Sequence, residues 1–119
     1  MKLSEVKNIL NAEVCCGEEF MDREISSAFA CDLMSDVLAF VENHALLLTG
    51  LVNSQVIRTA EMMDIKTIVF VRGKQPTEEI RELAKEYSMV VMSTKDILYT
   101  ACGKLYSSGL LPKGDEAGA

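Results

Sequence analysis

Three short apolar runs carry the strongest structural signal in this chain of 119 residues: ALLLT at 45–49, TIVFVR at 67–72 and MVVMS at 89–93. In each run the apolar residues are consecutive and do not alternate with polar ones. Such runs are typical of strands that are buried on both faces of a parallel sheet. The sequence therefore predicts a sheet with helices packed against both of its faces.

After each of these runs, apolar residues recur at the spacing of amphipathic helices. The three stripes are Val56, Ile57, Ala60 and Met63; Ile80, Leu83, Ala84 and Tyr87; and Leu98, Ala101, Cys102 and Leu105. Short polar residues mark where the helices begin: Asn53 precedes the first, residues 76–77 open the second, and Ser93 precedes the third, with Asp96 three residues on. Gly109 lies where the third helix should end.

Further units precede the first apolar run. Residues 25–31 are predicted to form a strand, followed by a short helix from 35 to about 42 with Val37, Leu38 and Val41 on its apolar side. The first twenty residues indicate a short amphipathic helix and a brief strand at 12–16.

Right-handed crossovers would stack these units into a small α/β domain: a doubly wound, mostly parallel sheet in a three-layer αβα arrangement. Its strands are predicted near 25–31, 45–49, 67–72 and 89–93. Residues 1–111 are expected to form a single domain, and residues 112–119 a flexible C-terminal tail with nothing to bury.

Charge and hydropathy exclude several classes of function. With 18 acidic and 12 basic residues, the net charge of -6 repels phosphate backbones, so nucleic-acid binding is not expected. The apolar stretches are strand-sized and too short to span a membrane. Charged residues interrupt any signal-peptide core in residues 1–20, so the protein is expected to be cytoplasmic.

The four cysteines are Cys15, Cys16, Cys31 and Cys102. In a cytoplasmic chain they are expected to be reduced, buried thiols. Adjacent residues of a strand point to opposite faces, so Cys15 and Cys16 are not expected to share a metal ion. With no C-x-x-C motif and a single histidine, neither a metal site nor a cofactor is predicted. The alternative that stays open is a thiol-based redox or metal-binding accessory protein.

Polar residues gather where the predicted strands end, which is where open α/β sheets bind ligands. The candidate ligand-binding residues are Asp32, Ser35, Thr49, Gly50, Asn53, Arg72, Lys74, Ser93, Thr94 and Lys95. Hydroxyls, glycines and cations at such an edge can receive a phosphate, although hydroxyls and amides also cap helices in folds that bind nothing. Only 6% of the residues are aromatic, so a nucleotide base would bind with modest affinity or between two subunits.

Signatures of catalysis are missing from the sequence. It contains no phosphate loop, no dinucleotide-binding fingerprint and no nucleophile elbow. His44 lies between a predicted helix and a strand, at the edge opposite the candidate site, and is not expected to act as a general base. The central strand ends in Thr49, not in the aspartate that a phosphoacceptor receiver domain needs. No catalytic residues are predicted.

Residues 30–53 also carry a resemblance. The chain reads ACDLMSDVLAF from 30 and ALLLTGLVN from 45, which resembles the DRTGG domain, a regulatory module named for an Asp-Arg pair ahead of a short helix and a Thr-Gly-Gly after the next strand. Asp32 matches the aspartate and Thr49 with Gly50 matches Thr-Gly, whereas Leu33 replaces the arginine and Leu51 the second glycine. Free-standing members of the family resemble this chain over roughly residues 1–111.

The resemblance implies an α/β fold, dimerisation and no catalytic activity. Family members occur fused to enzymes, including phosphotransacetylases, and between the nucleotide-sensing CBS domains of some pyrophosphatases. The chain is therefore expected to be a homodimeric regulatory or scaffolding domain with an enzyme as its partner. A second hypothesis is a sensor that binds an adenine nucleotide or another phosphorylated metabolite at the strand ends.

Overall fold

The computed structural model describes residues 1–40 and 44–112. The strands in these residues are β1 (Glu13–Cys16), β2 (Ser27–Ala30), β3 (Ala45–Thr49), β4 (Thr67–Phe70) and β5 (Val90–Ser93), and the helices are α1 (Leu3–Leu10), α2 (Met34–Phe40), α3 (Ser54–Met62), α4 (Glu78–Glu86) and α5 (Leu98–Ser107). A 3₁₀ turn spans Glu18–Phe20. The predicted tail beyond Pro112, and Val41 on the predicted 35–42 helix, lie outside the described residues.

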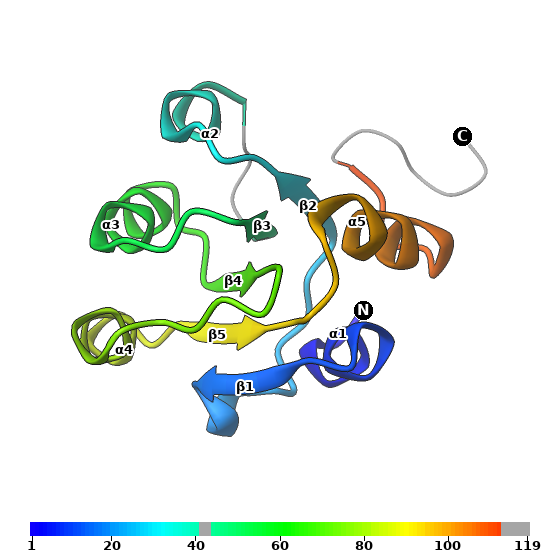
Figure 1. The fold of residues 1–119 in the computed structure, drawn as a ribbon, viewed down its shortest axis with the longest axis horizontal. Coiled ribbons are helices and arrows are strands. Elements are labelled where there is room, and N and C mark those ends of the chain that lie inside the picture. Colours follow the sequence, from blue (N-terminus) through cyan, green and yellow to red (C-terminus); the bar gives the residue numbers. More distant parts are fainter. Residues whose placement is uncertain (41–43, 113–119) are drawn as a thin grey trace.

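The strands form one sheet in the order β1-β5-β4-β3-β2. β2, β3, β4 and β5 are parallel neighbours in chain order, and β1 joins the far edge antiparallel to β5. Because the parallel strands advance in one direction, their right-handed crossovers place α2, α3 and α4 on one face, and α1 and α5 cover the other (Figure 1). The predicted mostly parallel, three-layer α/β fold is confirmed.

Two hydrophobic cores hold the layers together, one on each face of the sheet. Every residue of β3, β4 and β5 is buried, so alternate side chains of these strands supply both cores. The face under α2, α3 and α4 buries Val37, Ile57 and Ala84, and the face under α1 and α5 buries Val6 and Leu105. Burial on both faces explains why the three apolar runs have no polar alternation.

The edges of the sheet are short. β1 and β2 have four residues each. At the β2 edge the backbone N–H of Ala28 donates to the carbonyl oxygen of Leu111 at 3.3 Å, so the segment after α5 lies against this strand.

Two of the predicted helix starts are confirmed, and one is wrong. The side chain of Asn53 accepts from the N–H of Val56, and that of Thr77 accepts from the N–H of Ile80. Ser93, however, is the last residue of β5, and α5 begins four residues after the predicted start, with Ile97 at the N-cap and no side-chain capping bond. The chain needs residues 94–97 to pass from the sheet edge to the helix layer.

A bulge corrects the prediction that Cys15 and Cys16 point to opposite faces. Val14 pairs with Met92 and Cys16 with Val91, so β1 carries one more residue than its partner strand. Both cysteines therefore pack against the core under α2, α3 and α4.

The predicted apolar side of the second helix is also partly wrong. Val37 is fully buried, but Leu38 is 45% exposed. The described part of α2 is only seven residues long, and it reaches the core through Met34 and Val37, which are three residues apart on one stripe.

Left-handed residues end several of the helices. Asp64 (φ 56°) follows α3 and Ser88 (φ 56°) follows α4, each one residue beyond the C-cap. This is the position that most often holds glycine, because a side chain in this conformation crowds the backbone. After α5 the corresponding residue is Gly109, at φ 101°.

We expect Ser88→Gly to stabilise the protein. The substitution relieves a steric cost of about 1–2 kcal/mol, against which glycine loses about 0.5–1 kcal/mol through its greater freedom in the unfolded chain. The net gain in the free energy of unfolding should be about 0.5–1 kcal/mol, measured by urea denaturation. Ser107→Gly is the control, because Ser107 is the last α-helical residue of α5 and should lose about 0.5–1 kcal/mol. Equal effects of the two changes would contradict the interpretation.

Candidate functional site

The carboxyl ends of β2, β3, β4 and β5 lie at one edge of the sheet because these strands are parallel. The ten predicted site residues lie at the ends of β3 and β5, in the loops that leave this edge, and, for Ser35, in the first turn of α2. They fall into three groups: a hydrogen-bonded corner at the end of β3, a small cavity at the end of β5, and side chains with a structural role or no described bond.

The corner is built around the carboxylate of Asp32. Its Oδ1 atom accepts from the hydroxyl of Thr49 at 2.8 Å and from the backbone N–H of Gly50 at 2.8 Å. The same hydroxyl oxygen accepts from the N–H of Leu51 at 3.1 Å. One carboxylate oxygen thereby joins the loop after β2 to the end of β3, beside the backbone bond from Cys31 to Leu48.

Arg72 completes the corner from the loop after β4. A Cβ atom built on Gly50 would lie 3.1 Å from the Arg72 Nη2 atom and 3.6 Å from Asp32 Oδ2, so both groups approach the same point. Arg72 has φ 60°, a left-handed conformation, and its N–H donates to the carbonyl of Asp96 at 2.8 Å. The guanidinium is thus placed beside Gly50 by a strained residue whose backbone is fixed to the next loop.

The surroundings of Asp32 favour its ionised form. The Gly50 N–H bond lowers the pKa of this carboxyl below its usual value, with further lowering from the Thr49 hydroxyl and the charges of Arg72 and Lys74. At neutral pH the corner therefore contains a carboxylate anion.

The second group surrounds a cavity of about 230 Å³ at the end of β5. It is lined by Asn11, Glu13, Gly73, Gln75, Ser93 and Lys95. The hydroxyl of Ser93 donates to the carbonyl of Lys74 at 2.6 Å, which fixes the loop that forms one wall. Among the predicted residues, Ser93 and Lys95 line this cavity, and Lys74 is exposed on the same loop.

The remaining predicted residues have structural roles or no described bond. Asn53 caps α3. The buried hydroxyl of Thr94 donates to the carbonyl of Leu10 at 2.9 Å and so joins the β5 loop to the end of α1. Ser35 is exposed within α2, and its side chain makes no hydrogen bond among residues 1–40 and 44–112.

Four of the residues that line the cavity are absent from the predicted set: Asn11, Glu13, Gly73 and Gln75. Gly73 and Gln75 could have been found, since they flank Lys74 in a predicted loop. Asn11 and Glu13 could not, because they reach this edge only through the antiparallel pairing of β1 with β5.

Three of the four cysteines lie in surroundings that do not activate their thiols. Burial raises the pKa of the thiols of Cys15, Cys16 and Cys102 above the usual value. A raised pKa leaves less of the thiolate, the form that attacks disulfides and binds metals. In the part of the chain that the structure describes, no three His, Cys, Asp or Glu side chains are grouped so that they could hold a metal ion.

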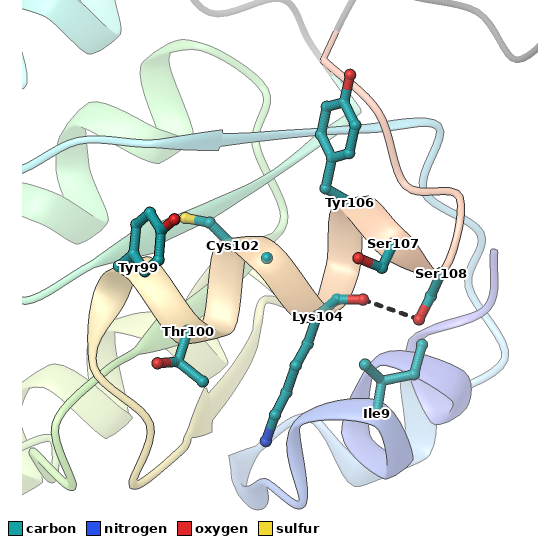
Figure 2. A pocket seen from close by; sticks show the side chains of 9 residues that line it. Ile9, Tyr99, Thr100, Cys102, Lys104, Tyr106, Ser107 and Ser108 are labelled. Atoms are coloured by element: carbon teal, nitrogen blue, oxygen red, sulfur yellow. Dashed lines mark hydrogen bonds between the residues drawn. The ribbon is translucent and has the colours of Figure 1, made fainter.

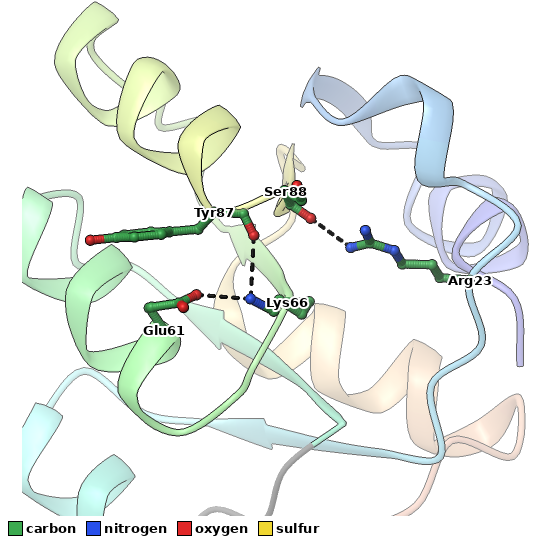
Figure 3. Close-up of polar contacts among 5 residues, drawn as sticks. All are labelled: Arg23, Glu61, Lys66, Tyr87 and Ser88. Carbon is green, nitrogen blue, oxygen red and sulfur yellow. Dashed lines mark hydrogen bonds and ion pairs between the residues drawn. The ribbon is translucent and has the colours of Figure 1, made fainter.

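Cations at the amino ends of the strands are engaged in structural contacts (Figure 3). The Lys66 ammonium lies 2.8 Å from Glu61 Oε2 and donates to the carbonyl of Tyr87 at 3.3 Å. Arg23 donates to the carbonyl of Ser88 at 2.6 Å. These two cations join α3, α4 and the N-terminal segment. The cations at the carboxyl ends, Arg72, Lys74 and Lys95, form no ion pair within residues 1–40 and 44–112.

A broad apolar hollow lies along the outer side of α5. Figure 2 shows its lining, in which Ile9 of α1 lies near Lys104 and Ser108 of α5, while Tyr99, Cys102 and Tyr106 project from the other side of the helix. Tyr99 is 86% exposed and Tyr106 is 55% exposed. Lys104 is the one charged residue in the lining, and its Nζ atom lies 2.8 Å from Asp96 Oδ2.

No helix within residues 1–40 and 44–112 has both the length and the apolar character needed to cross a bilayer.

Asp32→Ala should destabilise the fold by about 1 kcal/mol, because it leaves the Thr49 hydroxyl and the Gly50 N–H without their acceptor. Thr49 and Gly50 are buried, but Asp32 is exposed, so water can replace part of the lost bonding. Asp32→Asn keeps an acceptor oxygen and should lose less. Urea denaturation of both variants at neutral pH measures the difference. Equal losses in the two variants would show that these hydrogen bonds do not hold the corner together.

The pH dependence of the free energy of unfolding should reflect the ionisation of Asp32. The folded pKa of Asp32 is depressed, so its contribution is fully present above the unfolded pKa of about 3.9 and is lost as the pH falls through the lower folded pKa. The stability of the wild type relative to Asp32→Asn should therefore shrink below about pH 4. A difference between the two that stays constant on acidification would contradict this interpretation.

Comparisons with known proteins identify the fold and the family of the chain. A search of the curated proteins finds no match. Among solved structures, the chain is similar to the CBS and DRTGG domains of the regulatory region of Clostridium perfringens pyrophosphatase, complexed with its activator, diadenosine tetraphosphate. The TM-score is 0.72 at 19% identity, over 96% of this chain and 51% of that one, so the chain spans about half the length of this relative. The family model of the DRTGG domain matches residues 5–107, and the chain therefore belongs to the DRTGG domain family.

Proposed function

We propose that this chain is a non-catalytic regulatory domain that acts in the cytoplasm as a homodimer, controls an enzyme partner, and senses a phosphorylated small molecule at the carboxyl ends of its strands. The observation that carries the proposal is the set of three exposed cations at this edge: Arg72, Lys74 and Lys95. Within residues 1–40 and 44–112 none of them forms an ion pair. In a chain of net charge -6, such a group favours an anionic ligand.

The size of the cavity limits what can bind there. Drug-sized ligands occupy pockets of about 300–1,000 Å³, whereas the cavity beside Lys95 measures about 230 Å³. A phosphoryl group fits this volume and a whole nucleotide does not. An adenine nucleotide, the second candidate, would place its phosphates here and its base outside or against a second subunit. The diadenosine tetraphosphate bound by the pyrophosphatase region makes adenine polyphosphates sensible probes.

A regulatory role is preferred to thiol chemistry. The solved relative has its DRTGG domain in the regulatory region of an enzyme. The raised pKa values of Cys15, Cys16 and Cys102 disfavour a redox or metal-binding role for these thiols. Thiols that stay reduced also suit the cytoplasm.

The α5 hollow supports a homodimer. Its lining exposes Tyr99 and Tyr106, and aromatic side chains of this kind are enriched at protein interfaces. The charge of Lys104 is balanced by Asp96. Two copies that each carry a net charge of -6 repel one another over much of their surface, and this neutral, apolar face lets them approach at the lowest electrostatic cost.

Phosphate binding tests the ligand. Calorimetric titration with inorganic phosphate and ATP should show binding that weakens about fivefold for Lys95→Ala or Arg72→Ala, since one exposed charge contact contributes about 1 kcal/mol. Lys85→Ala is the control, because Lys85 is an exposed cation in the last turn of α4, at the other end of the sheet. No binding of either probe, or an equal loss in all three variants, would refute the proposed ligand class.

Sedimentation velocity tests the dimer. The wild type should sediment as a dimer at micromolar concentration, and Tyr99→Asp should shift it toward the monomer by placing a charge in the apolar face. Met62→Asp is the matched control, since Met62 is 74% exposed on α3, on the opposite face of the sheet. A wild-type monomer, or a dimer that is insensitive to Tyr99→Asp, would rule out this interface.

A further inference from the structure

We infer that the corner at the end of β3 is an anion seat for a phosphate group and that Asp32 occupies it as an internal competitor. The seat consists of the Gly50 N–H, the Thr49 hydroxyl and the Arg72 guanidinium. This inference rests on the proposed function. It adds a second phosphate position, at the end of β3 and apart from the cavity beside Lys95, and it names the group that a phosphate must displace there.

The geometry of the seat is that of an anion-binding site. Two donors converge on one point, since the Thr49 hydroxyl and the Gly50 N–H both lie 2.8 Å from the same Asp32 oxygen. A guanidinium stands beside them, 3.1 Å from the position of a Gly50 Cβ. Donors of this kind bind carboxylate and phosphate oxygens alike, and charge strengthens each bond.

The Asp32 carboxylate is accessible to solvent and can leave the seat. Asp32 is an exposed residue on the short loop between β2 and α2. Its side-chain bonds to the seat are the two from Thr49 and Gly50. A phosphate that takes its place would accept the same two bonds and would bring a second negative charge toward Arg72 and the exposed Lys74.

Competition between the Asp32 carboxylate and phosphate for the seat sets the apparent affinity for phosphate. A tethered group acts at an effective concentration of the order of millimolar or more, and the apparent dissociation constant rises as the open fraction of the seat falls. Removing the carboxylate should therefore strengthen phosphate binding at least about tenfold.

Replacement of Asp32 by a phosphate in the seat also lets one loop of the domain move. Asp32 ties the loop that begins α2 to β3, so its release frees that loop while the backbone bond from Cys31 to Leu48 remains. Leu33, next to Asp32, is 58% exposed at the start of α2. Phosphate binding would thus change the position of α2.

The test is a titration with inorganic phosphate followed by the NMR signal of the Gly50 amide. In Asp32→Ala this signal should shift with phosphate, at an apparent dissociation constant at least about tenfold below that of Asp36→Ala. Asp36 lies in the first turn of α2 and bonds to neither Thr49 nor Gly50, so its removal changes the net charge equally. Adding Arg72→Ala to Asp32→Ala should abolish the gain.

Further variants separate occupancy from charge and from misfolding. Asp32→Asn keeps the seat filled and should bind no better than Asp36→Ala. Asp32→Ser vacates the seat with a shorter polar side chain and replaces Asp32→Ala if that variant does not fold. In the wild type, saturating phosphate should shift the amides of residues 31–36.

Two results would overturn the inference alone. The first is equal affinity of Asp32→Ala and Asp36→Ala, with wild-type binding that still depends on Lys95. The second is a gain in Asp32→Asn as large as that in Asp32→Ala, which would trace the effect to charge. Absence of phosphate binding in the wild type and in every variant would overturn the proposed function as well.

Discussion

Parallel pairing of β3 with β4 and of β4 with β5 is the constraint on which the site depends. In that register Thr49 stands beside Phe70, and Phe70 beside Ser93, so the three strands end almost level. The loops that follow therefore start from a common line, and each needs only a few residues to reach its neighbour. Backbone bonds from Arg72 to Asp96 and from Gly73 to Thr94 join two of these neighbouring loops. The strands are buried on both faces, so a slip in register would break two cores together.

The two ends of the sheet use charge in different ways. At the amino ends, Lys66 and Arg23 are held by a carboxylate and by the carbonyls that follow α4, which suits cations near helix C-termini. At the carboxyl ends, Arg72, Lys74 and Lys95 are exposed, and the Asp32 carboxylate accepts the N–H of Gly50. The same residue types thus stabilise the fold at one end and remain accessible at the other.

The layers of the fold could be predicted from the sequence, whereas the geometry of the corner at the end of β3 could not. Uninterrupted runs such as 45–49 predict buried parallel strands, and short polar residues such as Asn53 and Thr77 predict helix starts, because both signals are local. The bulge at Cys15, the start of α5 at Leu98 and the position of β1 depend on how distant segments pair. The approach of Arg72 to Gly50 depends on a left-handed backbone in a residue that is not glycine, which no local pattern indicates.

The borders of the sheet have a consequence for assembly. β1 is four residues long and bulged, and the strand on the other border, β2, already receives a backbone bond from the segment after α5. Neither border offers a long, straight row of free amides and carbonyls to another chain. Growth of the sheet from molecule to molecule, the route to fibres, is thereby disfavoured, and recognition between copies is left to side chains on the helical layers.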